Sequence, residues 1–292
     1  MTQRQLDAPT AGHGPLPADP ATARPAAPAR GVARVVKLGG RVQADPALAA
    51  ALAAAWRDAP GALVVVHGGG DEVSALQRRM GYEPTFLGGR RVTGEGDIDL
   101  LRMALSGLAN KRLVSALVAR GVHALGLSGE DAGLLSATPA EPAELGFVGR
   151  PTAVNAGLLA YLLDAGYLPV VSPLAAKACG AAGALNVNGD DAAAAIAGGL
   201  GAEELLFVSD VPGVLLGGTP VPSLDVQEAA AAVDTGAAGG GMVPKLGAAA
   251  LALALGVRRV RIGDLAALHD PARGTAVTQR QPHSASVGSS TP

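Results

Sequence analysis

The chain has 292 residues, enough for one large core or for two lobes that share a sheet. Its 23 lysines and arginines and 25 aspartates and glutamates leave a net charge of -2 with no basic block, which excludes duplex nucleic acid as an expected partner. A single cysteine, Cys179, excludes an intrachain disulfide framework and is typical of a reducing cytosol.

The two ends of the sequence are predicted to be disordered tails. Residues 1–30 are rich in proline and alanine, and residues 281–292 are short and polar. The amino-terminal stretch lacks the apolar core of a signal peptide. The longest clean apolar run, residues 246–257, is shorter than the roughly 20 residues that a spanning helix needs. We therefore expect a cytoplasmic protein without a membrane partner.

Short apolar runs alternate with longer alanine- and leucine-rich segments between the tails. The predicted strands lie at residues 34–38, 62–66, 123–127, 168–172, 204–208 and 258–262. The predicted helices lie at residues 45–59, 96–121, 190–201 and 244–256. Apolar strands joined by helices indicate a parallel sheet covered on both faces. We predict an α/β fold, a three-layer α/β/α sandwich around a mostly parallel central sheet.

Glycines and small polar residues follow nearly every predicted strand. The exits read "KLGG" (37–40), "HGGG" (67–70), "LSGED" (127–131), "SPLA" (172–175) and "SDVPG" (209–213). Ligands of parallel sheets collect at this edge, beyond the carboxyl ends of the strands. Glycine lets backbone N–H groups approach phosphate oxygens closely. The pattern therefore predicts a site for a polyanion.

Two lysines adjoin glycine turns, although none follows "HGGG" in the manner of a P-loop. Lys37 ends the first predicted strand, and Lys245 opens a helix after "GGGMVP". Phosphoryl transfer needs positive charge where oxygens gather negative charge, so both are candidate catalytic residues. No G-x-G-x-x-G motif follows the first strand, which disfavours a dinucleotide-dependent dehydrogenase.

Nine short strings resemble those of the acetylglutamate kinases of the amino acid kinase family, in the same order and at similar spacings. They are "VVKLGG", "VVVHGGG", "GRRVT", "ANKRLV", "GLSGED", "GYLPVVSPL", "LNVNGDDAA", "FVSDVPGV" and "GGGMVPKL". The resemblance covers about residues 32–277. One string departs from the family, because "SGEDAG" replaces the commoner "SGxDGG".

The resemblance assigns roles to individual positions. It implies that Lys37 and Lys245 stabilise the transferring phosphoryl group and that Asp190 orients both lysines. It places the backbone of Gly39, Gly40, Gly68 and Gly69 along the phosphoryl path, and Ser209 and Asp210 on the nucleotide side. The residues implied for the acyl amino acid are Gly69, Gly70, Arg91, Asn186 and Asn188, with Arg91 gripping its carboxylate.

Several neighbours of these positions are expected to have lesser roles. Arg90 is expected to be a solvated surface charge, and Asp191 an acid at a helix start. His67 is expected to form structural hydrogen bonds and to transfer no proton. Glu130 and Asp131 are candidates for shaping the site.

The implied reaction converts ATP and N-acetyl-L-glutamate into ADP and N-acetyl-L-glutamyl 5-phosphate, the second step of arginine biosynthesis. The γ-carboxylate is already an anionic nucleophile, so no general base is required. Mg²⁺ is implied by the use of ATP, and no protein ligand set for it is predicted. Residues 31–175 would form a lobe for the acyl amino acid and for dimerisation, and residues 176–280 a lobe for ATP.

Alternatives remain within and outside this class, because the residues of the acyl pocket cannot be read from sequence. A kinase for N-succinylglutamate or an acyl-aminoadipate is the nearest one, and a non-catalytic amino-acid sensor is another. The assembly is expected to be a homodimer that L-arginine inhibits weakly. Six prolines precede Val32 and disfavour the linking helix of arginine-sensitive hexamers.

Overall fold

A central sheet of eight strands organises residues 34–279, the part of the chain that the computed structural model describes. The tails predicted at residues 1–30 and 281–292, including the prolines before Val32, lie outside the described residues. Across the sheet the strands are β14 (Ser223–Asp225), β16 (Thr275–Thr278), β15 (Arg259–Gly263), β11 (Glu204–Val208), β1 (Arg34–Leu38), β2 (Leu63–His67), β8 (Leu168–Ser172) and β5 (Ala124–Ser128). Only β15 and β16 pair antiparallel within this sheet. The predicted mostly parallel sheet is therefore confirmed.

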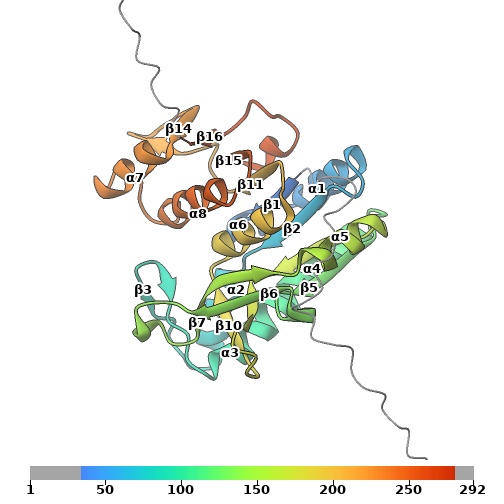
Figure 1. Cartoon of the computed structure of the whole chain (residues 1–292), viewed down its shortest axis with the longest axis vertical. Coiled ribbons are helices and arrows are strands. Elements are labelled where there is room, and N and C mark those ends of the chain that lie inside the picture. The colour runs from blue at the N-terminus through green and yellow to red at the C-terminus, as the bar shows by residue number, and fades with distance from the viewer. Residues whose placement is uncertain (1–33, 280–292) are drawn as a thin grey trace, which may run out of the picture.

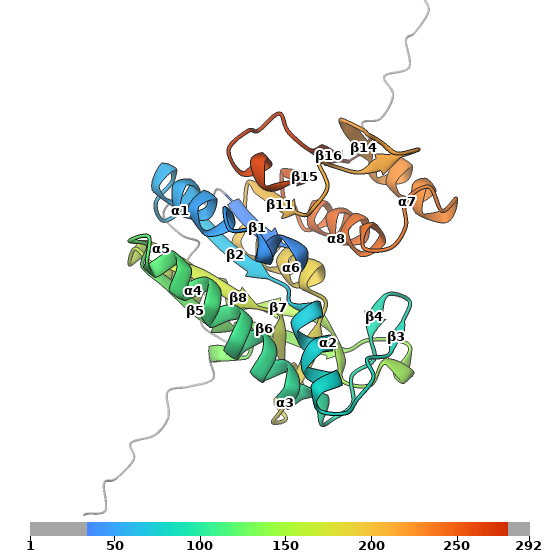
Figure 2. The same cartoon turned by 180° about the vertical axis from the view of Figure 1, so that it is seen from behind.

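Helices cover both faces of the sheet, as Figures 1 and 2 show from opposite sides. One face carries α5 (Ala156–Asp164), α6 (Gly189–Leu200) and α8 (Met242–Ala254). The other carries α1 (Leu48–Asp58) and α4 (Asn110–Val118). Each of the six predicted strands appears in the sheet. The apolar side chains of the inner strands β1, β2, β8 and β11 are buried between the two helical layers, whereas those of the edge strand β5 are only partly buried.

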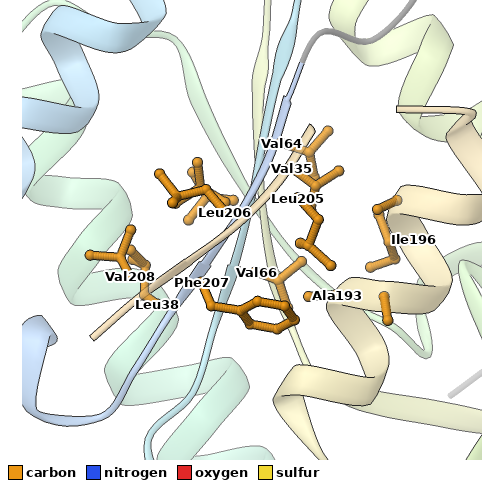
Figure 3. Packing of buried hydrophobic residues seen from close by; sticks show 14 of the residues in the cluster. Val35, Leu38, Val64, Val66, Ala193, Ile196, Leu205, Leu206, Phe207 and Val208 are labelled. Carbon is orange, nitrogen blue, oxygen red and sulfur yellow. The ribbon is translucent and has the colours of Figure 1, made fainter. Parts of the chain in front are cut away.

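Side chains alternate between the two faces of the central strands (Figure 3). Val35, Val64 and Leu205 point toward α6, whereas Leu206 and Val208 point to the opposite face. By this alternation Lys37, two residues after Val35, belongs to the α6 face. A lysine that is buried among aliphatic side chains needs a carboxylate partner.

Small residues bring α6 and α8 close together. Ala194, one turn before Gly198 in α6, is fully buried. At Gly198 an added Cβ would lie 2.6 Å from the Cβ of Leu255, just beyond the end of α8. The spacing of the two helices therefore depends on the absence of larger side chains at these positions.

Several elements were not predicted from the sequence. Strands β6 (Leu135–Pro139), β7 (Val148–Val154), β9 (Leu174–Lys177) and β10 (Ala184–Val187) form a small closed barrel beside α6. Helix α5 and strands β14 and β16 of the central sheet were also missed. So were helices α2 (Gly70–Arg79) and α7 (Val226–Asp234) and the two-residue strands β3 (Phe86–Leu87), β4 (Arg90–Arg91), β12 (Leu215–Leu216) and β13 (Thr219–Pro220). The predicted helix at 96–121 forms in three consecutive parts, α3 (Asp97–Leu101), a π-helical segment (Arg102–Ala109) and α4. Short 3-10 segments complete the elements at Arg41–Ala44, Asp131–Gly133, Ala143–Leu145 and Leu265–Leu268.

The predicted boundary between the two lobes, after residue 175, lies within strand β9. The division into lobes therefore stays a prediction. Within residues 34–279, no helix is both long enough and apolar enough to cross a membrane.

Candidate active site

A buried carboxylate joins the two lysines that the sequence singled out. Oδ1 of Asp190 lies 2.6 Å from Nζ of Lys37, and Oδ2 lies 3.6 Å from Nζ of Lys245. Asp190 is 3% exposed and Lys37 6%. The three side chains come from the first turn of α6, from strand β1 and from the first turn of α8. Residues that are far apart in sequence thus form one charged cluster at the edge of the sheet.

The start of α6 holds Asp190 in place. The side chain of Asn188 caps this helix and accepts a hydrogen bond of 2.8 Å from the backbone N–H of Asp190. An acid in the first turn is also stabilised by the helix dipole. Burial lowers the pKa of Lys245; Asp190 opposes this shift, and the charge of Lys37 adds to it. Asp190 therefore helps to keep Lys245 in its charged form.

Two glycine turns face this cluster. After β1, the N–H of Gly39 donates to the carbonyl of Val208 at 2.9 Å, and after β2 the N–H of Gly68 donates to the carbonyl of Leu38 at 3.1 Å. Gly69 has a φ of 149°, and a Cβ there would lie 2.5 Å from Leu105. Among the described residues the N–H groups of Gly40 and Gly69 have no hydrogen-bond partner. These groups are available to the oxygens of a phosphoryl group.

His67 supports the second turn from behind. Its ring is fully buried, with Nδ1 2.7 Å from the carbonyl oxygen of Gly68 and Nε2 3.1 Å from the side-chain nitrogen of Asn110. Since the carbonyl can only accept and the amide nitrogen can only donate, Nδ1 carries the proton. Burial lowers the pKa of His67 to about 4. This is the structural role expected from the sequence.

His67 is expected to make the folded protein sensitive to acid. The unfolded chain binds a proton near pH 6.5 and the folded chain only near pH 4, so stability is fully present above 6.5 and falls as the pH drops toward 4. The shift corresponds to about 3 kcal/mol of unfolding free energy. Urea unfolding over this pH range should show a flatter dependence for His67→Gln than for the unmodified protein. His123→Gln, at an exposed histidine, is the control, and equal slopes for the unmodified protein and His67→Gln would contradict the assignment.

The first of two cavities at the site contains most of the predicted substrate residues. Apolar side chains and the second glycine turn make up much of its wall. Its polar lining includes Lys37, Arg90, Arg91, Asn186, Asn188 and Asp190. Its other lining residues include Gly68, Gly69, Gly70, Val73, Phe86, Leu101, Leu105 and Val148. Asn186 is held from β10 by a 2.9 Å hydrogen bond from its Nδ2 to the hydroxyl of Thr93.

Arg91 is buried at the wall of this cavity with only neutral acceptors. Its guanidinium donates to the carbonyl of Gly70 at 2.9 Å, to the hydroxyl of Ser74 at 2.8 Å and to the side-chain oxygen of Gln77. It also lies over the ring of Phe86, 4.8 Å from the centroid. Burial lowers the pKa of Arg91. A buried cation without a carboxylate partner is suited to bind the carboxylate of a ligand.

The expectation for Arg90 was wrong, because this arginine is not a solvated surface charge. Its Nη2 lies 2.9 Å from Oδ2 of Asp191, and the side chain lines the same cavity as Arg91. Asp191 follows Asp190 in α6 and has a side chain that is 13% exposed. Burial raises the pKa of Asp191, and the charge of Arg90 opposes that rise. The pair links strand β4 to helix α6 across 101 positions of sequence.

Glu130 and Asp131 do not line either cavity of the site. Glu130 pairs with Arg102 at 2.6 Å, and the carboxylate of Asp131 accepts a hydrogen bond from the backbone N–H of Ser128 at 2.8 Å. Both residues therefore stabilise the turn after β5.

A second cavity is lined by Lys245 and by the residues predicted for phosphate and nucleotide, except Gly68, which lines the first cavity. It shares Gly40 and Gly70 with the first cavity. Its lining also includes Gly39, Arg41, Asp71, Ser209, Asp210, Gly239, Gly241, Met242 and Lys245. Sequence reasoning missed Arg41, which pairs with Asp210 at 3.0 Å and lowers the pKa of that carboxyl. The arrangement provides two ligand cavities that meet at glycine turns and lysines, as transfer between two ligands requires.

Comparison with known proteins identifies the class. The sequence profile of the amino acid kinase family matches residues 33–264, so the chain belongs to this family. Within it, the chain is 45% identical to an acetylglutamate kinase of Chloroflexus aurantiacus over 238 residues, 81% of this chain and 93% of that protein. It is 46% identical to an acetylglutamate kinase of Methanopyrus kandleri over 224 residues, 73% and 90% of the two chains. The resemblance recognised in the sequence is thereby confirmed.

Solved structures agree on the fold. A protein of Streptococcus mutans is 29% identical with a TM-score of 0.75, over 85% of this chain and 98% of that chain. An N-acetylglutamate synthase of Neisseria gonorrhoeae is 26% identical with a TM-score of 0.72, over 87% of this chain and 61% of that chain. The carbamate kinase of Giardia lamblia, at 16% identity and a TM-score of 0.65 over 86% and 99% of the two chains, shares the fold.

Proposed function

We propose that the protein uses ATP to phosphorylate the γ-carboxylate of N-acetyl-L-glutamate, which yields N-acetyl-L-glutamyl 5-phosphate in the second step of arginine biosynthesis. The observation that carries this proposal is the cluster of Lys37, Asp190 and Lys245 between two cavities. Relatives named acetylglutamate kinase, at 40% to 46% identity over most of the chain, support the choice of substrate.

ATP occupies the second cavity in this proposal. Ser209 and Asp210 line the part of this cavity that would bind the nucleotide. Gly39, Gly40 and Gly68 would line the route of the phosphoryl group between the two ligands. Among residues 34–279, no group of three or more His, Cys, Asp or Glu side chains could hold a metal ion. When bound with ATP, Mg²⁺ would be held mainly by the phosphates and would neutralise part of their charge.

N-acetyl-L-glutamate occupies the first cavity. Arg91 grips the α-carboxylate, and Asn186, Asn188, Gly69 and Gly70 complete the binding of the acyl amino acid. The γ-carboxylate attacks as an anion, so its reaction requires no base. Lys37 and Lys245 stabilise the charge of the phosphoryl group as it passes between the ligands, and Asp190 holds both lysines in position.

We also propose the division into a lobe for the acyl amino acid, residues 31–175, and a lobe for ATP, residues 176–280. The first lobe forms a homodimer in the cytoplasm. Sedimentation combined with kinetics tests the assembly, and a hexamer that submillimolar L-arginine inhibits steeply would contradict it.

A coupled assay of ADP release against a panel of acids tests the proposed reaction. The panel contains N-acetyl-L-glutamate, N-succinyl-L-glutamate, an acyl-aminoadipate and free L-glutamate. The highest kcat/KM is expected for N-acetyl-L-glutamate. A higher value for another acid would reassign the substrate, and no ADP release with any of them would favour a non-catalytic sensor.

Replacing Arg91 with lysine is expected to weaken binding of the acyl amino acid while binding of ATP stays nearly unchanged. Lysine keeps the positive charge but cannot form the two parallel hydrogen bonds that a guanidinium makes with a carboxylate. Calorimetric titration of both ligands measures the two affinities. Arg78→Lys, at an exposed arginine of α2, is the matched control, and an equal loss for ATP would remove Arg91 from the substrate site.

A further inference from the structure

The positively charged side chains around the first cavity differ in whether a carboxylate pairs directly with them. Lys37 pairs with Asp190 at 2.6 Å, and Arg90 pairs with Asp191 at 2.9 Å. Arg91 donates only to neutral oxygens, and no carboxylate lies within ion-pair distance of it among the described residues. Of the two arginines at the wall, Arg91 thus lacks a direct carboxylate partner, whereas Arg90 has one in Asp191.

Asp191 pairs with Arg90 without lining the cavity itself. Arg90 lines the cavity, whereas Asp191 does not. The Asp191 carboxylate is largely buried at the start of α6, and its ion pair with Arg90 compensates the cost of this burial. Losing the partner of a buried charge is costly, because the charge left behind is neither solvated nor paired.

We propose that Asp191 restricts the protein to neutral acyl groups by neutralising Arg90. The proposal rests on the proposed function, in which the substrate is an N-acylated glutamate. Such a substrate with a neutral acyl group carries two carboxylates, one for Arg91 and one for the phosphoryl transfer site. A dicarboxylic acyl group such as succinyl carries a third carboxylate. This carboxylate would approach Arg90, which is already paired with Asp191.

Asp191→Asn tests this assignment because it removes the charge and keeps the shape. In the full chain, the measured quantity is the ratio of kcat/KM for N-succinyl-L-glutamate to kcat/KM for N-acetyl-L-glutamate. The ratio is expected to rise roughly tenfold or more, since a released guanidinium can form a charge-assisted hydrogen bond with the third carboxylate. Using a ratio within each variant cancels any general loss of activity.

Four further variants separate charge from structure. Asp191→Glu restores a carboxylate and should keep the ratio of the unmodified protein. Adding Arg90→Gln to Asp191→Asn should abolish the rise, because the released cation is gone. Asp99→Asn removes a carboxylate that is 77% exposed and pairs with Arg102, and it should leave the ratio unchanged. Asp191→Ser removes the charge in a second way if the asparagine variant folds poorly.

The outcomes distinguish this inference from the proposed function. If the unmodified protein phosphorylates neither acylated glutamate, the proposed function fails and the inference fails with it. If it acts on N-acetyl-L-glutamate but Asp191→Asn and Asp191→Ser leave the ratio unchanged, only the inference fails. A rise that persists without Arg90, or that also appears in Asp99→Asn, overturns it too.

Discussion

Replacing Lys245 with alanine is expected to lower kcat about 100-fold or more, with a much smaller change in the KM for N-acetyl-L-glutamate. Nζ of Lys245 lies 3.6 Å from Asp190, next to the cavity proposed for the nucleotide. Its charge therefore acts on oxygens that gain negative charge mainly in the transition state, and the loss of one such group costs roughly 3 kcal/mol.

Steady-state kinetics with each substrate varied in turn measures this effect. Lys177→Ala is the control, because Lys177 belongs to β9, lies over the ring of Phe147 and lines neither cavity of the site. An unchanged kcat in Lys245→Ala would remove this lysine from the catalytic set. A large rise in KM alone would instead assign it to ground-state binding.

Replacing Asp190 with asparagine is expected to affect both catalysis and stability. The change leaves Lys37 and Lys245 without the carboxylate that lies between them, and Lys37 is almost fully buried. Breaking a buried ion pair in this way typically costs about 3–5 kcal/mol of unfolding free energy. Since Asp190 raises the pKa of Lys245, its loss should let this lysine deprotonate at lower pH.

Two measurements test the Asp190→Asn prediction independently. Urea unfolding gives the loss of stability, and the dependence of kcat on pH should show activity lost earlier as the pH rises. Asp264→Asn is the control, because it breaks a 2.6 Å pair with Arg273 and neither residue lines either cavity of the site. A variant with the stability and pH profile of the unmodified protein would contradict the orienting role of Asp190.

The sheet and the members of the charged cluster were predictable because their sequence signals are local or belong to short motifs. The run that contains Lys37 is a buried strand followed by glycines, and Asp190 opens a helix that an asparagine caps. Such patterns are fixed by side-chain burial and by the hydrogen bonds of helix ends, which act over a few residues. The resemblance to a family then joined these distant segments in one site.

Contacts that join distant segments could not be read from the sequence. Arg90 and Asp191 are 101 residues apart, and neither has a neighbour in sequence that predicts the pair. The same is true of His67 and Asn110, whose hydrogen bond spans 43 residues. The strands of the small barrel were missed because they are short or interrupted by glycine and proline, as Pro151 interrupts β7. Their pairing depends on tertiary context rather than on local propensity.

The close approach of α6 and α8 at Gly198 bears on the charged cluster, because each helix carries one of its members. Asp190 belongs to α6 and Lys245 to α8. The distance between the Asp190 carboxylate and the Lys245 ammonium group therefore depends on the spacing of the two helices. A methyl group at Gly198 would lie 2.6 Å from Leu255 and would push the two helices apart, roughly two turns of α6 away from Asp190. The distance between Asp190 and Lys245 thus depends on a glycine that lines neither cavity of the site.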